Sequence, residues 1–241
     1  MQRFWELDAL RGIAIIMMVA SNSLLDLDYF WGAGISLGSG PWFWFARITA
    51  SIFIFLAGAS LSISNSRSRG LPESERAKKF VWRGTKIFLL GMTITAVTWA
   101  LFPSEFIVFG ILHFIGISIA ISPLFLRLGK WNLAAGLGII IAGIALAPLR
   151  FGFNWLLWLG LAPAGFRSFD YFPLLPWLGI MLIGIFAGSA LYPNAKRIFW
   201  LAENSGFVAR KLCWLGRHSL KIYFLHQPFI VGAILLLRAI A

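Results

Sequence analysis

A series of polar residues in the first apolar segment of this sequence could take part in chemistry. Its members recur every three or four residues: Asp8, Arg11, Ile15, Met18, Asn22 and Asp26. That spacing places them on one face of a helix. Because an ionisable group inside a membrane span costs about 2.5–3.5 kcal/mol on insertion scales, we expect this face to point into the protein.

Three histidines are candidate proton carriers, because imidazole titrates near neutral pH. His113 and His226 lie inside apolar segments, and His218 lies at the edge of one. The alternative for each is a hydrogen-bonded packing residue. Three isolated histidines and a single cysteine form no zinc-type cluster, so we predict no metal site.

Two carboxylates end the first apolar segment, and one arginine lies inside the second. Asp26 and Asp28 precede the turn, and Arg47 lies about two helical turns into the next segment from the same side. A buried pair of Arg47 with Asp26 or Asp28 would offset the desolvation of both charges. The alternative is an ion pair that only fixes helix register.

The composition is that of a membrane protein. Of 241 residues, 59% are hydrophobic and 12% are charged, with a mean hydropathy of +0.82. Soluble domains are roughly half apolar and about a quarter charged. This excludes a soluble enzyme, a disordered chain and a coiled coil, and a lone cysteine, Cys213, excludes a disulfide scaffold.

We predict an all-α integral membrane protein, a single bundle of about seven transmembrane helices in one domain over residues 1–241. The apolar segments lack the period-2 alternation of an outer-membrane barrel. A further segment, near 151–165, is apolar but short, and we interpret it as interfacial or re-entrant. The predicted spans are 7–25, 41–63, 86–102, 106–126, 131–149, 172–192 and 219–237.

The basic residues predict the orientation of these spans. Most of the 21 lysines and arginines precede the first span or lie in the loops after the second, fourth and sixth. Basic loops stay in the cytoplasm, so the N-terminus is predicted to be cytoplasmic and the C-terminus external. This pattern accounts for the net charge of +12 without a nucleic-acid partner, and membrane lipids are the expected surroundings.

Four motifs, in order, carry a resemblance to a known family. The sequence resembles the small prokaryotic branch of the heparan-α-glucosaminide N-acetyltransferase catalytic-domain family, and the similarity covers nearly the whole chain. The motifs are LDALRGIAI at 7–15, FGILH at 109–113, FDYFPLLPW at 169–177 and LGRHSLKIYFLHQP at 215–228.

The resemblance implies a multi-pass cell-membrane enzyme. Such an enzyme transfers an acetyl group from cytoplasmic acetyl-CoA, its co-substrate, to an amine or hydroxyl of an external sugar or glycan. It also suggests a homodimer. Related acyltransferases place a histidine or asparagine eleven residues after the motif arginine, and here Asn22 holds that position.

One departure from the family concerns the catalytic base. The lysosomal member uses a histidine in the outer loop after its first motif helix, whereas residues 24–43 contain none. Asn22 cannot replace it, because an amide does not titrate. Asp26, Asp28 and His113 are the candidate substitutes.

These arguments predict a set of site residues. Asn22 or His226 would donate to the thioester oxyanion, and Asp26 or His113 would take the acceptor's proton. Cationic side chains would hold the donor's phosphates. The predicted catalytic residues are Asn22, Asp26, His113 and His226. The predicted donor-binding residues are Arg11, Arg83, Lys86 and Arg217. The predicted substrate-binding residues are Asp28, Arg47 and Asp170.

Two other functions are compatible with the sequence. A small-molecule or lipid transporter would use the polar face as a permeation path, and flux without acyl transfer would identify it. A non-catalytic relative would bind acyl-CoA or a partner, and the missing loop histidine is the argument for it.

Overall fold

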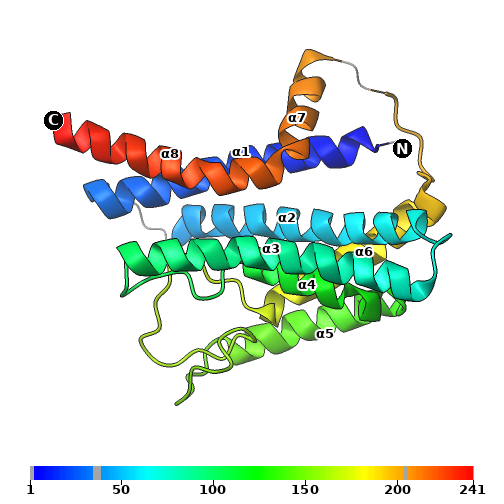
Figure 1. Ribbon diagram of the computed structural model, residues 1–241, viewed down its shortest axis with the longest axis horizontal. Coiled ribbons are helices and arrows are strands. Elements are labelled where there is room, and N and C mark those ends of the chain that lie inside the picture. The colour runs from blue at the N-terminus through cyan, green and yellow to red at the C-terminus, as the bar shows by residue number, and fades with distance from the viewer. Residues whose placement is uncertain (1–2, 35–38, 204–205, 241) are drawn as a thin grey trace. The chain divides into compact units, whose positions relative to one another are not determined.

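The computed structural model describes residues 3–34, 39–203 and 206–240, which form helices joined by loops (Figure 1). Within these ranges there is no β-strand, and the one isolated β-bridge joins Phe109 to Tyr171. The protein is therefore all-α, as predicted. Its elements are α1 (Trp5–Trp31), α2 (Gly40–Arg67), α3 (Glu73–Leu101), α4 (Ile111–Leu126), α5 (Trp131–Leu146), α6 (Leu174–Leu191), the 3₁₀ turn η1 (Pro193–Ala195), α7 (Phe207–Arg217) and α8 (Ser219–Ile240).

Five of the described helices are long and apolar enough to cross a membrane, namely α1, α2, α3, α6 and α8. Helices α4 and α5 are apolar but have 16 residues each. At 1.5 Å per residue they rise about 24 Å, less than the ~30 Å of a bilayer core. The protein is thus a membrane protein, while the count of seven spans and the orientation of the termini stay predictions.

Two helices, α3 and α4, begin at residues that differ from the starts of the predicted spans. Helix α3 begins at Glu73, thirteen residues before the predicted span, because a polar run of helix-forming residues follows Pro72 and places carboxylates in the first turn. Helix α4 begins only at Ile111, since residues 102–110 form turns and extended chain that include Pro103. The segment near 151–165 contains turns and no helix.

Helix α7 lies within a stretch that we predicted as a loop. Its small residues Ala209, Cys213 and Gly216 recur every three or four positions and are buried on one face. Phe207 and Trp214 are exposed on the other face. Eleven residues are too few to span a bilayer, which is why hydropathy alone does not reveal this helix.

The chain divides into two compact units, and the boundary falls inside α2. The first unit contains residues 1–53 and 201–241. In it, α1 packs along α8, and α7 crosses α1 (Figure 1). A Cβ on Gly12 would clash with the Leu212 carbonyl, and one on Gly216 would clash with the Asp8 carbonyl. Glycine at both positions therefore lets the backbones of α1 and α7 touch.

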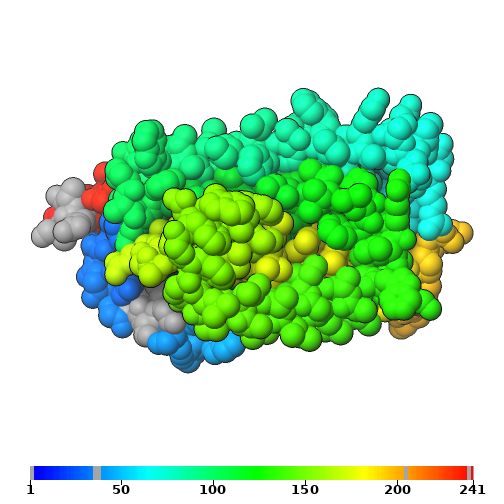
Figure 2. All heavy atoms as spheres, turned by 90° about the horizontal axis from the view of Figure 1, so that it is seen from below, coloured from blue at the N-terminus to red at the C-terminus, as the bar shows by residue number. Residues whose placement is uncertain are grey.

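The second unit contains residues 54–200, in which α3 packs along α4 and α5 along α6. The part of α2 in this unit packs against α6, because Gly58 lies against the Met181 carbonyl. The small residues 57–60 thus serve helix packing. The long loop between α5 and α6 gathers at one end of α3 and α5 (Figure 2).

Candidate functional site

The polar face predicted on α1 is turned into the first unit. The most buried members are Asp8, Ile15, Met18 and Asp26, each less than 9% exposed. Arg11 and Asn22 are partly buried on the same face. The spacing of these residues therefore predicted correctly which side of α1 packs against other helices.

Asn22 of α1 meets His226 of α8. The Asn22 amide nitrogen lies 2.7 Å from His226 Nε2, and His226 Nδ1 lies 2.6 Å from the Tyr223 carbonyl. A carbonyl only accepts, so the proton of the neutral ring is on Nδ1, and Nε2 accepts from Asn22. The same amide nitrogen lies 3.3 Å from the Met18 sulfur, a weak acceptor.

One turn further along α1, Asp26 meets Gln227. The Gln227 amide donates to Asp26 Oδ1 at 2.7 Å, and the Asp26 side chain is 2% exposed. The other oxygens of the pair, Asp26 Oδ2 and Gln227 Oε1, are buried without a hydrogen-bond partner among the residues that the structure describes. Leaving two buried acceptors unsatisfied is costly, and an N–H or O–H group of a ligand would satisfy them.

Gln227 was missed by the sequence reasoning. The one signal for it was its place beside His226 in the fourth motif. Asp26, one of the two carboxylates predicted to pair with Arg47, accepts a hydrogen bond from Gln227. A pair of Arg47 with Asp28 stays a prediction. The Arg47 guanidinium lies over the Phe43 ring, 4.6 Å from its centroid.

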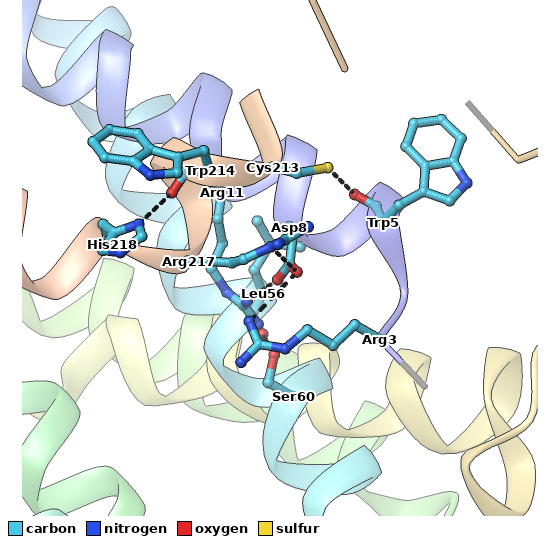
Figure 3. A network of polar contacts seen from close by, with 10 residues as sticks. All are labelled: Arg3, Trp5, Asp8, Arg11, Leu56, Ser60, Cys213, Trp214, Arg217 and His218. Carbon is cyan, nitrogen blue, oxygen red and sulfur yellow. Dashed lines mark hydrogen bonds and ion pairs between the residues drawn. The ribbon is translucent and has the colours of Figure 1, made fainter. Parts of the chain in front are cut away.

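At the other end of α1, three arginines surround the buried carboxylate of Asp8 (Figure 3). Arg11 Nη1 lies 3.0 Å from Oδ1, Arg217 Nε lies 3.4 Å from Oδ2, and Arg3 Nη1 lies 4.0 Å from Oδ2. Three guanidinium charges against one carboxylate leave a local excess of two positive charges. Arg11 and Arg217 were predicted as phosphate ligands, whereas the roles of Asp8 and Arg3 in joining them were not foreseen.

The arginine cluster and the Asn22–His226 pair lie on the same stretch of α1. Eleven residues separate Arg11 from Asn22, which corresponds to about 16 Å along a helix axis. The basic cluster and the polar pair are therefore joined by one rigid element.

His113 lies in the second unit and is 1% exposed. Its Nδ1 accepts from the Gly110 backbone N–H at 3.2 Å, and its Nε2 lies 3.2 Å from the Thr95 hydroxyl, which itself donates to the Ile107 carbonyl. Nε2 therefore carries the proton and donates to Thr95. Both ring nitrogens are engaged in holding the start of α4 against α3.

Asp170 also holds the start of α4. Its Oδ2 accepts from the Ile111 backbone N–H at 2.9 Å, and a carboxylate at a helix N-terminus interacts favourably with the helix dipole. Arg83 and Lys86 are exposed on α3 in this unit, with the Lys86 ammonium 5.2 Å from the centroid of the Trp82 ring. Asp28 is half-buried on α1. The ligand-binding roles of these residues stay predictions.

A comparison with known families identifies the chain. The family described as heparan-alpha-glucosaminide N-acetyltransferase, catalytic, matches residues 3–228, a range that contains both the arginine cluster and the polar pairs of α1 and α8. The chain matches no curated protein and no solved structure.

Proposed function

The chain belongs to the heparan-alpha-glucosaminide N-acetyltransferase catalytic family, whose members are transmembrane acetyltransferases, and we propose that it transfers acetyl from cytoplasmic acetyl-CoA to an amine or hydroxyl of an external sugar. The observation that supports this most directly is the contact of Asn22 with His226, which joins the helix that carries the first motif to a residue of the last motif. The cell membrane is the proposed location.

The donor's phosphates bind at the arginine cluster. Arg11 and Arg217 are already oriented by Asp8, and guanidinium groups form strong charge-assisted bonds with phosphate. The pantetheine arm then follows α1 for about 16 Å and brings the thioester to Asn22. The arginines of the cluster outnumber the carboxylate of Asp8, and the resulting positive charge attracts the phosphates of the donor.

The acetyl transfer takes place beside Asn22 and Asp26. The acceptor's nitrogen or oxygen attacks the thioester carbonyl carbon, while Asp26 Oδ2 takes its proton. Gln227 occupies Oδ1, so the buried Oδ2 is the oxygen left for the proton. The tetrahedral intermediate then expels the thiolate of coenzyme A, which receives the proton back from Asp26. The products are the acetylated acceptor and coenzyme A as its thiol.

Asn22 stabilises the oxyanion, and His226 positions Asn22. One N–H of the Asn22 amide donates to His226 Nε2, while the second lies near the Met18 sulfur. Exchanging a weak sulfur acceptor for a developing oxyanion strengthens that bond only in the transition state, which is the condition for catalysis. We assign no base role to His113 in this proposal, because both its nitrogens are already bonded.

The first test is acetyl-CoA binding to the purified protein by calorimetry, with dephospho-CoA for comparison. We expect micromolar affinity that weakens when the 3′-phosphate is absent. Arg217→Ala removes one member of the cluster, and Arg210→Ala removes the same charge from an exposed position on α7 as the matched control. A folded protein that does not bind acetyl-CoA contradicts the proposal, and the polar face of α1 then fits a transport path better.

A further inference from the structure

A cavity of about 280 Å³ opens in the second unit, and the proposal above uses none of the residues that line it. It is formed by the loop between α3 and α4 and the loop between α5 and α6. The residues that line it are Glu105, Phe166, Arg167, Ser168, Phe169 and Tyr171.

The cavity is held in shape by bonds between its two loops. The Phe169 backbone N–H donates to the Glu105 carbonyl at 3.0 Å, and the Phe172 N–H donates to the Phe109 carbonyl at 2.9 Å. The Ser168 hydroxyl donates to the Phe106 carbonyl at 2.9 Å. Because these bonds join the two loops directly, the loops themselves hold the walls of the cavity in place, which lowers the cost of ordering the chain on binding.

The walls combine aromatic rings with one ion pair. The rings of Phe166 and Tyr171 meet edge to face with centroids 5.0 Å apart. The Tyr171 hydroxyl donates to the Leu157 carbonyl at 2.7 Å, and burial raises the pKa of Tyr171 to about 12, so the ring stays neutral. Arg167 Nη1 and Glu105 Oε1 lie 3.5 Å apart, longer than an ordinary hydrogen bond.

We propose that this cavity binds one pyranose ring of a carbohydrate. The C–H face of a pyranose packs against aromatic rings, while its hydroxyls need both donors and acceptors at the rim, as Arg167 and Glu105 provide. A simple anion would be repelled by Glu105 and a simple cation by Arg167. The volume lies below the ~300–1,000 Å³ of pockets for drug-sized ligands, which favours a single sugar unit.

The inference rests on the proposed function, which requires an external sugar acceptor. Both loops lie at the end of α3 opposite the basic connection between α2 and α3. That connection is predicted to be cytoplasmic, so the cavity faces the outside. It thus gives the acceptor a binding site on residues distinct from those that bind the donor.

The experiment is saturation-transfer NMR with methyl β-D-glucopyranoside and the full chain in lipid nanodiscs, without acetyl-CoA. Nanodiscs replace maltoside detergents, because a maltose headgroup would compete for the cavity. We expect saturation of the ring C–H protons. Glu105→Gln and Arg167→Gln should each weaken binding about ten-fold, as for loss of a hydrogen bond to a charged group. Arg150→Gln is the control, because its guanidinium bonds to the Ala147 and Leu149 carbonyls in the same loop.

Acetyl-CoA calorimetry on the same samples separates this inference from the proposed function. Protein that binds acetyl-CoA but shows no saturation transfer overturns the sugar site alone. Transfer that survives both substitutions also overturns it. Transfer that needs Glu105 and Arg167, in protein that does not bind acetyl-CoA, supports the sugar site and contradicts the proposed donor. Melting temperatures show whether either variant is unfolded. In that case Phe166→Leu replaces it in the test, because leucine keeps the apolar volume and removes the aromatic ring. The sugar site then requires that Phe166→Leu weakens binding.

Discussion

Asn22 and His226 lie 204 positions apart in the chain, yet the amide nitrogen of one is 2.7 Å from the ring Nε2 of the other. Each is turned toward the other by a local contact, Asn22 beside the Met18 sulfur and His226 by the Tyr223 carbonyl. The pair therefore links the first and last described helices of the first unit through an amide whose second N–H has only a weak acceptor.

From this pair we predict that Asn22→Ala lowers kcat by about 10²–10³, the range found for loss of one oxyanion donor. The affinity for acetyl-CoA should stay within about two-fold, because the phosphates bind at the other end of α1. Steady-state kinetics and calorimetry give the two values. Equal losses in both would show that Asn22 supports the fold and not the transition state.

His226→Gln tests the positioning role of the histidine. Glutamine offers an acceptor oxygen to the Asn22 amide but lacks a ring N–H fixed by Tyr223, so we expect kcat to fall by about ten-fold, less than for Asn22→Ala. The double variant should be no slower than Asn22→Ala alone, since the two residues act as a unit. Independent, multiplicative losses would contradict this role.

The pair of Asp26 and Gln227 provides a test of the proposed proton acceptor. Asp26→Asn should abolish measurable transfer, because the buried Oδ2 is the proposed proton site. Gln227→Met removes the donor to Oδ1 at similar size, and should lower kcat without changing donor affinity. Single-turnover kinetics measure the chemical step for each variant, and calorimetry measures donor affinity. If Gln227→Met leaves kcat unchanged, the hydrogen bond to Asp26 Oδ1 has no part in the proton transfer.

The arginine cluster makes a prediction about donor selectivity. Arg217→Ala should weaken acetyl-CoA binding by about ten-fold, and if Arg217 contacts the 3′-phosphate it should abolish the preference over dephospho-CoA. Asp8→Asn tests how far the orientation of Arg11 and Arg217 contributes to the affinity, because it removes the negative charge that both arginines contact. If the Arg217→Ala protein keeps its full preference for acetyl-CoA over dephospho-CoA, the 3′-phosphate does not bind at Arg217.

Glycines at the contact of α1 with α7 predict a loss of stability. Gly216→Ala would push a methyl group into the Asp8 carbonyl, and Gly12→Ala would push one into the Leu212 carbonyl. We expect each to lower the melting temperature, since backbone atoms cannot move aside cheaply. Gly232→Ala on α8 is the matched control, because its Cβ would meet open space. There, alanine should be neutral or stabilising by up to about 1 kcal/mol.

Periodicity and hydropathy predicted part of this architecture. The three- and four-residue spacing of the polar series from Asp8 to Asp26 predicted the buried face of α1, because a helix places such positions on one side. Asn22 and His226 were each predicted as site residues. Their contact was not, because no local pattern specifies which residue of α8 faces which residue of α1.

Other features depend on tertiary contacts that the sequence does not express. Gln227 was overlooked because an amide next to a histidine carries no signal until Asp26 lies opposite it. Helix α7 was overlooked because its eleven residues are too few for a membrane span, so a search for apolar spans does not reveal it. His113 was predicted to be a possible base, and only the structure shows Gly110 and Thr95 at its two nitrogens.

Cys213 provides a pH-dependent test of the contact between α1 and α7. The thiol is 4% exposed and lies 3.3 Å from the Trp5 carbonyl. Burial raises the pKa of Cys213, the charge of Asp8 acts in the same direction, and Arg217 opposes both. Thiolate is the reactive species, so maleimide should label Cys213 more slowly than an unfolded cysteine at neutral pH, and the rate should rise only at higher pH than for a free thiol.

The raised pKa of Cys213 also determines how the stability of the folded protein changes with pH. A thiol whose pKa is higher in the folded protein is protonated in both states below its unfolded pKa, ~8.5, so no stability is lost there. As the pH rises from that value through the folded pKa, the unfolded chain ionises first and the folded state loses stability. The melting temperature should therefore fall more steeply above about pH 9 in the wild type than in Cys213→Ala. Parallel curves, or fast labelling at pH 7, would show that α7 does not keep Cys213 buried against α1 in the membrane.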